Sequence, residues 1–279
     1  MKYFTACREH QLPVLLGSMR RFCKPFHLFV LAWDFEQPSG EDFTVIPRAD
    51  LFARHPDYLT LPGPPRETIN QIDTCRWRAM ADLLRGGRGP LLHVDGDQWF
   101  FSSPAALIEE VAGAKLAVSP HRIPAPEEGI PGVTLATHRQ YGLYNTGLAY
   151  IADAEIAEMM AAACYRWSYS HTEPQPDGTW LFGDQGNLER IARDTGAHVI
   201  RHPGVNVAPW NSNRHRLSTR DGQIFVDDVP LVTYHFSSLK WNANGSFRQY
   251  ADANYCVPNI YIDTVYKPYI DAILKAGNP

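Results

Sequence analysis

The stretch 90–101 constrains the fold more than any other part of the chain. Residues 91–94, Leu-Leu-His-Val, form a short and mostly apolar run behind a Gly-Pro pair, which predicts a buried strand. The strand leads into Asp95-Gly96-Asp97. If the extended geometry continues, residues i and i+2 point to the same side, so Asp95 and Asp97 converge at the carboxyl end of the strand. A hard divalent cation would relieve their repulsion, and open α/β sheets bind ligands at this edge.

A solvated turn after a strand is the alternative explanation of the Asp-x-Asp pattern. A calcium-binding loop would require further acidic residues downstream. Instead, the aromatic run Trp99-Phe100-Phe101 follows. This run indicates that the chain returns to a core, which favours the metal site over the solvated turn.

The N-terminal part alternates between strand and helix patterns. Residues 2–6, 27–33 and 45–46 predict strands, and the apolar residues of 11–22 recur with a helical period. This β-α-β order is typical of an α/β fold with a parallel sheet. Residues 6–10, where the first strand meets its helix, lack the glycines of a phosphate-binding loop.

The rest of the chain continues this mixture and adds a hairpin around Asp227-Asp228, between strands at 224–226 and 229–234. Residues 123–131 and 172–178 contain prolines and predict loops, and residues 250–276 mix helix and loop. The remaining predicted helices are 66–84, 105–112, 153–168 and 184–192, and the remaining predicted strands are 115–119, 144–151 and 198–200.

Composition excludes several classes of protein. The 279 residues suffice for one large domain or two small ones. The formal net charge is −4 and no lysine- or arginine-rich block occurs, so nucleic acid is not expected as a partner. No run reaches the roughly 18 apolar residues that span a bilayer. The five cysteines are far apart and form no Cys-x-x-Cys, which indicates reduced thiols and a cytoplasmic protein.

Several polar residues allow two interpretations. Arg76 and Arg78 belong to the predicted helix before the strand 91–94. Either both side chains are solvated, or one of them reaches a diphosphate. Asp184 is either a helix N-cap or part of a site. A lone histidine such as His235, just after a strand, is more often structural than a ligand. Gly147, inside a strand, would let a ligand approach the backbone.

The order of the motifs resembles a known family. The strand with Asp-x-Asp is followed by Tyr-Asn-x-Gly at 144–147, Asp-Gln at 184–185, Asn-Val-Ala-x-Trp-Asn at 206–211 and His-Phe-Ser-x-x-Lys-Trp at 235–241. This series resembles bacterial nucleotide-sugar glycosyltransferases of the GT-A fold, in particular those related to the retaining glycosyltransferase family 8. The resemblance runs from the first strand to about residue 241.

The resemblance implies a GT-A domain with a Rossmann-like, mostly parallel sheet flanked by helices, a small antiparallel addition and a C-terminal helical and loop region. Residues 1–241 would be the catalytic domain, with a nucleotide-binding part at about 1–120 and an acceptor part at about 121–241. Residues 242–279 would be an extension packed on the same domain.

The resemblance also implies roles for individual residues. Mn²⁺ or Mg²⁺ would be the cation, and the mixed oxygen and nitrogen ligands mildly favour Mn²⁺. Asp95, Asp97 and His235 would be the metal ligands. Lys240 and either Arg76 or Arg78 would contact the diphosphate, and Thr5, Ala6 and Cys7 would contact the uracil and ribose. Asn145, Asp184 and Gln185 would lie near the donor sugar and its anomeric carbon.

The chain departs from the family pattern in the last motif. Ser238 stands where the family usually has glycine, no proline separates Lys240 from Trp241, and the spacing from His235 to Lys240 is one residue shorter. These departures concern the loop that approaches the diphosphate.

The expected function is therefore metal-dependent transfer of a hexose-type sugar from a UDP-sugar to a hydroxyl of a glycan or glycolipid, with retention. The expected location is cytoplasmic, with a peripheral contact at the inner membrane face left open. A non-catalytic nucleotide-sugar-binding protein is one alternative, although it would not need Asp184 and His235 together with both aspartates. A sugar nucleotidyltransferase is another, but it would want a glycine-rich loop after the first strand. The motif of an aspartyl phosphatase would require Thr or Val after Asp-x-Asp, and this chain has Gln98 there.

Overall fold

A central sheet organises the structure, a computed structural model that describes residues 1–60, 67–123, 141–167, 183–241, 247–248 and 257–277. Among these residues, seven strands lie in the order β3-β2-β1-β4-β7-β6-β8. The four strands from β3 to β4 are mutually parallel, β7 is antiparallel to both β4 and β6, and β8 is parallel to β6. This confirms the predicted α/β class with a mostly parallel sheet. The strands are β1 (Lys2–Cys7), β2 (His27–Ala32), β3 (Phe43–Pro47), β4 (Leu91–Val94), β6 (Leu116–Pro120), β7 (Tyr144–Ile151) and β8 (His198–Val199).

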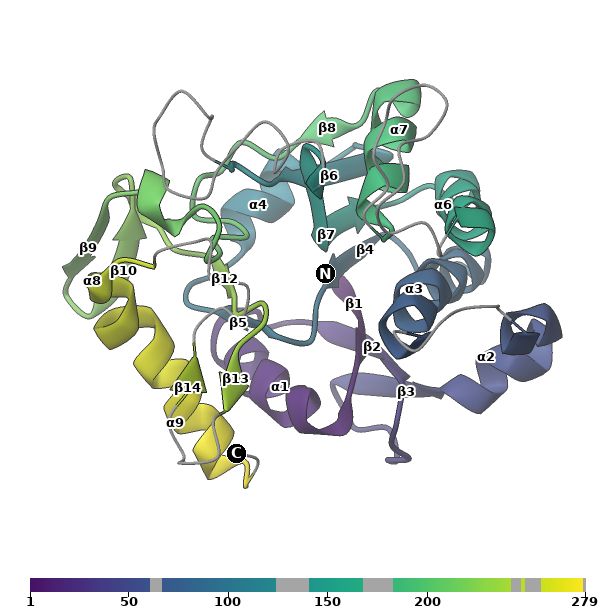
Figure 1. Ribbon diagram of the computed structural model, residues 1–279, viewed down its shortest axis with the longest axis horizontal. Helices are drawn as coiled ribbons and strands as arrows, with labels where there is room; N and C mark the ends of the chain where they lie inside the picture. The colour runs from purple at the N-terminus through teal and green to yellow at the C-terminus, as the bar shows by residue number, and fades with distance from the viewer. Residues whose placement is uncertain (61–66, 124–140, 168–182, 242–246, 249–256, 278–279) are drawn as a thin grey trace.

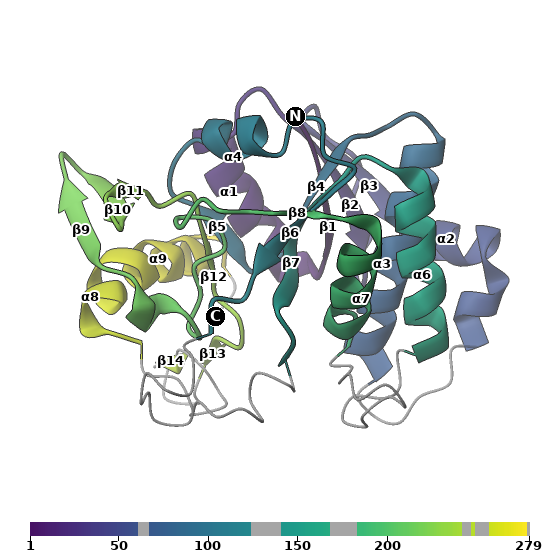
Figure 2. The ribbon, with the colours of Figure 1, turned by 90° about the horizontal axis from the view of Figure 1, so that it is seen from above.

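Helices cover both faces of the sheet, because successive residues of each strand point to opposite sides. Phe4 and Ala6 of β1 belong to one core cluster, with residues of α3, α6 and α7. Tyr3 and Cys7 belong to the other, with residues of α1 and α4. Figure 2 shows these two groups of helices on opposite sides of the strands. The helices are α1 (Leu12–Phe22), α2 (Arg48–Arg54), α3 (Glu67–Arg85), α4 (Ala105–Glu110), α6 (Ala154–Trp167) and α7 (Gln185–Thr195), with short 3-10 turns η1 (Glu9–Gln11) and η2 (Pro56–Thr60).

The second half of the chain adds small antiparallel units beside the main sheet (Figure 1). The most important for the site is β5 (Gln98–Phe100), which pairs with β12 (Thr233–His235). The others are the three-stranded unit β9 (Leu217–Arg220), β10 (Gln223–Val226) and β11 (Val229–Pro230), the pair β13 (Lys240–Trp241) and β14 (Phe247–Arg248), and the 3-10 turn η4 (Ser212–Arg214).

The C-terminal helices cover β12 and the end of α1. α9 (Lys267–Lys275) follows the short α8 (Asn259–Tyr261) and a π-helical turn, η5 (Ile262–Tyr266). Their aromatic side chains join a third core cluster with Val14 of α1 and Tyr234 of β12. The ring of Tyr269 stacks on Phe236 with centroids 3.7 Å apart, so this segment holds the chain that follows His235.

The structure corrects three predictions about local geometry. Asp95, Gly96 and Asp97 do not continue the strand but form a tight turn, in which the N–H of Gln98 donates to the carbonyl of Asp95 at 3.1 Å. The predicted strand 229–234 is two strands, β11 and β12, which pair with different partners. The helix that begins after Asp184 continues to Thr195 rather than ending at 192. Residues 124–131 of the predicted loop 123–131, and the whole predicted loop 172–178, lie outside the described residues. No described helix is both long enough and apolar enough to cross a membrane.

Candidate functional site

Three predicted metal ligands, Asp95, Asp97 and His235, come together at the carboxyl end of β4. Nε2 of His235 lies 3.1 Å from Oδ1 of Asp97 and 3.8 Å from Oδ2 of Asp95. One donor atom from each of the three residues can be chosen so that all lie within 4.8 Å of one another. The pairing of β5 with β12 produces this arrangement, because it sets His235 opposite Gln98, directly after the Asp-x-Asp turn.

Gly147 on β7 makes room for the ring of His235. A Cβ atom at Gly147 would lie 2.6 Å from Nδ1 of His235 and 2.7 Å from Oδ1 of Asn145, which is closer than real Cβ contacts. The sequence predicts that Gly147 lets a ligand approach the backbone, whereas in the structure the group that approaches is the His235 side chain.

Only one oxygen of Asp95 is free to face His235 and Asp97. Its Oδ1 accepts from Nη1 of Arg76 at 2.6 Å and lies 3.1 Å from Nε2 of His93. Burial raises the pKa of Asp95, but Arg76 and the hydrogen bond with His93 lower it more, so the pKa is well below its usual range. The carboxylate is thus ionised and oriented with Oδ2 toward the cluster.

His235 is buried, and its Nε2 is the nitrogen that faces the two carboxylates. Its Nδ1 is buried without a hydrogen-bond partner among the described residues, and its ring packs edge-on against Trp210 at 5.3 Å. Burial lowers the pKa of His235, but Asp97 and Asp95 raise it further, and the net pKa is raised. Two carboxylates with one imidazole form an oxygen and nitrogen donor set that suits Mn²⁺ or Mg²⁺. The residues present therefore fit a divalent cation.

Arg76 on α3 holds three carboxylates together. Its Nη1 contacts Asp95 at 2.6 Å, and its Nη2 contacts Asp184 at 2.6 Å and Asp73 at 2.9 Å. Nη2 also donates to Oγ1 of Thr146 at 3.2 Å. A charged group can stay buried when it is paired in this way. Burial alone would lower the pKa of Arg76, but Asp184, Asp73 and Asp95 raise it well above its ordinary value.

Arg78 lies away from the site, which corrects its prediction as a diphosphate contact. Residues two apart on a helix point in different directions. The Arg78 guanidinium contacts Glu158 of α6 at 2.5 Å and Asp82 at 3.1 Å, and it does not line the cavity that contains the metal cluster. Of the two arginines left open by the sequence, only Arg76 belongs to the site.

Asp184 precedes α7 but does not cap it, so the capping interpretation is wrong. Its side chain makes no hydrogen bond to the first turn of the helix. Instead, Oδ2 accepts from the indole Nε1 of Trp77 at 2.8 Å and from Arg76, and Oδ1 accepts from Oγ1 of Thr146 at 2.9 Å. The residue is only 3% exposed.

Asn145 and Gln185 are held next to each other. Nδ2 of Asn145 donates to Oε1 of Gln185 at 2.8 Å, and Oδ1 of Asn145 accepts from Nδ2 of Asn206 at 3.1 Å. Nε2 of His121 lies 3.1 Å from the same oxygen of Gln185. These contacts fix the orientation of the Gln185 amide at the N-terminus of α7.

A cavity of about 590 Å³ joins these groups. Lys240 lines it from β13, and Ala6 and Cys7 line it from the end of β1. Thr5, the third predicted nucleoside contact, is fully buried and does not line the cavity. Burial raises the pKa of the Cys7 thiol well above its ordinary value, so it is neutral. The other predicted residues in the lining are Arg76, Asp95, Asp97, Asn145, Asp184, Gln185 and His235.

Ser238, where the resemblance leads one to expect glycine, adopts a glycine-like backbone. Its φ is +59°, in the left-handed region that L-residues rarely occupy. Ser238 lines the cavity together with Ser237 and Lys240. The loop therefore keeps the left-handed conformation that a glycine favours, although the residue is serine.

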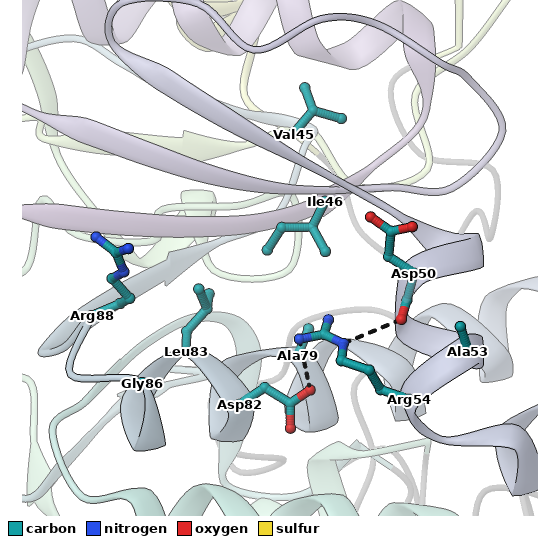
Figure 3. Close-up of a pocket in the computed structure, with 10 residues that line it drawn as sticks. All are labelled: Val45, Ile46, Asp50, Ala53, Arg54, Ala79, Asp82, Leu83, Gly86 and Arg88. Carbon is teal, nitrogen blue, oxygen red and sulfur yellow. Dashed lines mark hydrogen bonds and ion pairs between the residues drawn. The ribbon is translucent and has the colours of Figure 1, made fainter.

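A second cavity, also of about 590 Å³, lies between β3, α2 and α3 (Figure 3). It is lined by apolar side chains, among them Val45, Ile46 and Leu83, and by charged ones. Arg54 contacts Asp82 there at 3.5 Å. None of the predicted site residues lines this cavity.

Four residues of the site were not predicted from the sequence. His93 was detectable, because it lies on the predicted strand two residues before Asp95, and its Nε2 is 3.1 Å from Oδ1 of Asp95 in the structure. Asp73 also carried a signal, because it lies three residues before Arg76 on a helix. Burial raises the pKa of Asp73 to about 8, with Asp184 and Asp95 adding to the rise and Arg76 opposing it. The other two are His121 and Thr146, whose contacts depend on the tertiary structure.

Comparisons with known proteins give the following likenesses. No protein-family model matches the chain. The uncharacterized proteins YfnD and YfnF of Bacillus subtilis (strain 168) are 27% identical over 188 residues and 28% identical over 250 residues. These matches cover 64% and 84% of this chain, and 55% and 78% of the two relatives. The chain thus spans only about half the length of YfnD.

Two solved structures share the fold. A complex of the galactosyltransferase LgtC with donor and acceptor sugar analogs has a TM-score of 0.53 and 13% identity, covering 95% of this chain and all of that one. An active-site mutant of LgtC has a TM-score of 0.54 with the same identity and coverage. At this level of identity the likeness concerns the fold alone, and it confirms the GT-A architecture predicted from the motifs.

Proposed function

We propose that this protein is a metal-dependent glycosyltransferase that moves a hexose-type sugar from a UDP-sugar to a hydroxyl of a glycan or glycolipid, with retention of anomeric configuration. The convergence of Asp95, Asp97 and His235 carries the proposal, because these residues line the same cavity as Lys240, Asp184 and Gln185. The GT-A fold, which LgtC uses to bind donor and acceptor sugar analogs, supports it.

Asp95, Asp97 and His235 would hold Mn²⁺ or Mg²⁺ in this enzyme. When bound, the cation stabilises the negative charge that develops on a diphosphate leaving group. Lys240 lines the same cavity from β13 and would place a second positive charge there. Ala6 and Cys7, at the end of β1, would contact the uracil and ribose. Thr5 would act only through the packing of β1, because it is fully buried.

Asp184, Gln185 and Asn145 would surround the donor sugar. Both oxygens of Asp184 already accept hydrogen bonds, from Arg76, Trp77 and Thr146, which disfavours this carboxylate as an attacking nucleophile. We therefore infer that the acceptor hydroxyl attacks from the face that the nucleotide leaves, and that Asp184 stabilises positive charge on the sugar. Gln185, with its oxygen held by Asn145, would orient the sugar.

The domain division expected from the sequence belongs to the same proposal. Residues of about 1–120 would bind the nucleotide, residues of about 121–241 would bind the acceptor, and residues 242–279 would form an extension. A cytoplasmic location, with peripheral contact at the inner membrane face, would suit a glycolipid acceptor.

Release of UDP from a panel of UDP-sugars, with and without Mn²⁺, tests the proposal. We expect metal-dependent release from one hexose donor, and we expect Asp97→Asn and His235→Ala to abolish it. Asp227→Asn is a matched control, because Asp227 also pairs with a histidine, His215, at 2.6 Å, but does not line the cavity. Metal-independent binding of UDP without turnover would refute the transferase and favour a binding protein. NMR of the product tests retention, and an inverted product would contradict it.

A further inference from the structure

Asp73 is the accessible carboxylate at the part of the cavity that also contains Asp184. Its side chain is 21% exposed, whereas Asp184 is 3% exposed and uses both oxygens within the protein. Both residues contact the same nitrogen of Arg76, Nη2, at 2.9 Å and 2.6 Å. A ligand that reaches this end of the cavity therefore meets Asp73 more readily than Asp184.

One oxygen of Asp73 is available to a ligand. Oδ1 contacts Arg76, but no hydrogen bond to Oδ2 is found among the described residues. A Cβ atom at Gly183 would lie 3.4 Å from this Oδ2, so the backbone before α7 passes beside the carboxylate without pairing with it. Asp73 lines the cavity itself.

The orientation of Arg76 separates Asp73 from the metal cluster. Nη1 of Arg76 faces Asp95, and Nη2 faces Asp73 and Asp184. A diphosphate would lie beside the cation and Lys240, on the side of Arg76 that faces Asp95. The part of a donor that could lie beside Asp73 is therefore the sugar, which carries hydroxyl donors.

We infer that Asp73 is a specificity-determining residue whose Oδ2 hydrogen-bonds a hydroxyl of the donor sugar, an inference that rests on the proposed function. A carboxylate accepts from a hydroxyl, and a carboxylic acid can also donate to one, so the contact exists in either protonation state. A buried polar group that is built to bind a hydroxyl discriminates strongly against a ligand without it. The protein should therefore reject deoxy donors that lack this one hydroxyl.

A series of monodeoxy UDP-sugars tests the inference. We expect the wild-type protein to prefer the parent donor over one of these analogues. The preference is measured as the ratio of kcat/KM for the parent donor to kcat/KM for the analogue. Asp73→Ala should reduce this ratio by about tenfold, equivalent to about 1.4 kcal/mol, while changing the Kd of UDP by less than about twofold. The change should appear for one hydroxyl only, which identifies the contacted position. A general structural defect would instead weaken UDP and every donor alike.

Asp82→Ala is the matched control. Asp82 lies on the same helix, also contacts an arginine, Arg78, at 3.1 Å, and lines the cavity of Figure 3 rather than the site. Its removal should leave the ratio unchanged. Asp73→Asn keeps the shape of the side chain and replaces Asp73→Ala if that variant does not fold. Because its amide can still hydrogen-bond a hydroxyl, the preference should fall by less than tenfold, while the UDP affinity is retained.

The outcomes separate this inference from the proposed function. An unchanged ratio in Asp73→Ala with intact UDP binding, or an equal change in Asp82→Ala, would overturn the role of Asp73 and leave the transferase standing. If the wild-type protein neither binds UDP nor releases it from any UDP-sugar, the proposed function fails and this inference fails with it.

Discussion

Two glycines make room for neighbouring side chains, Gly147 for His235 of the metal cluster and Gly96 for residues beside the Asp-x-Asp turn. At Gly147 a Cβ atom would collide with His235, and at Gly96 it would lie 2.6 Å from the Cβ of Cys7 and 2.9 Å from Oε1 of Gln11. In neither case is an unusual backbone the reason, because both φ values lie outside the left-handed region. The packing around the site thus depends on glycine at these two positions as well as on the predicted ligands.

Gly147→Ala should displace the ring of His235. Overpacking of a close-packed interior costs about 1–3 kcal/mol, and we expect the affinity for Mn²⁺ to fall by at least about tenfold. Calorimetric titration with Mn²⁺ and urea unfolding measure the two effects. Gly17→Ala is the control, because nothing lies within 4 Å of a Cβ there and the position is inside α1, where alanine should stabilise by about 0.5–1 kcal/mol. Unchanged Mn²⁺ affinity in Gly147→Ala would contradict the steric argument.

Removal of Arg76 should be more harmful than removal of Arg78. Arg76→Met would leave Asp73, Asp95 and Asp184 without their shared cation, and an uncompensated buried charge costs about 3–5 kcal/mol. Arg78→Met should cost less, because its partner Glu158 reaches solvent. Urea unfolding of both variants at neutral pH tests the difference, and equal losses would show that Arg76 does not organise the cluster.

At the scale of elements, Glu110 joins the end of α4 to the segment after β8. Its Oε1 accepts from the N–H of Arg201 at 2.6 Å and lies 3.0 Å from Nε2 of His198, and its Oε2 accepts from the N–H of His202 at 3.2 Å. Burial raises the pKa of Glu110, but these hydrogen bonds lower it more, so the pKa is below its ordinary value. One carboxylate therefore fixes the segment 198–202, which leads to Asn206, against the end of α4.

Glu110→Gln should destabilise the protein by about 1–3 kcal/mol at pH 7. A lowered pKa means that the stabilisation is complete above the unfolded pKa of about 4.3 and is lost as the pH falls through the lower, folded value. The difference in unfolding free energy between wild type and variant should thus be smaller at pH 4 than at pH 7. The exposed neighbour provides the control Glu109→Gln, which should change little at either pH. A difference that does not depend on pH would refute the role of the charge.

The elements with a clear period were predictable from the sequence, and those defined by distant pairing were not. The helix 11–22 and the strands 27–33 and 144–151 follow from their apolar patterns, and they appear within about two residues of the prediction. Residues 229–234 look like one strand in the sequence. In the structure only the last part of this segment, in β12, pairs with β5, which is far away along the chain. The alternatives for Asp184 and His235 depended on which side chains lie nearby, and local patterns carry no such information.

At the scale of the whole molecule, the metal cluster joins segments that are distant in sequence. Asp95 and Asp97 connect the main sheet to β5, and His235 ends the strand that pairs with β5. The C-terminal helices pack on the same region through Tyr234 and Phe236. A cation bound by all three ligands would therefore bind the folded protein and not the unfolded chain.

Mn²⁺ should consequently raise the melting temperature of the metal-free protein. At a concentration of 100 times Kd, binding adds about 2.7 kcal/mol, which corresponds to roughly 5 °C or more for a chain of this size. Asp97→Asn should lose the shift, whereas Asp227→Asn should retain it, because its carboxylate pairs with His215 away from the cluster. The shift with Mn²⁺ should exceed that with Mg²⁺ at equal concentration, because an imidazole ligand suits Mn²⁺ better. An equal shift in wild type and Asp97→Asn would place the bound cation elsewhere, and the cluster would then have to be explained by its charges alone.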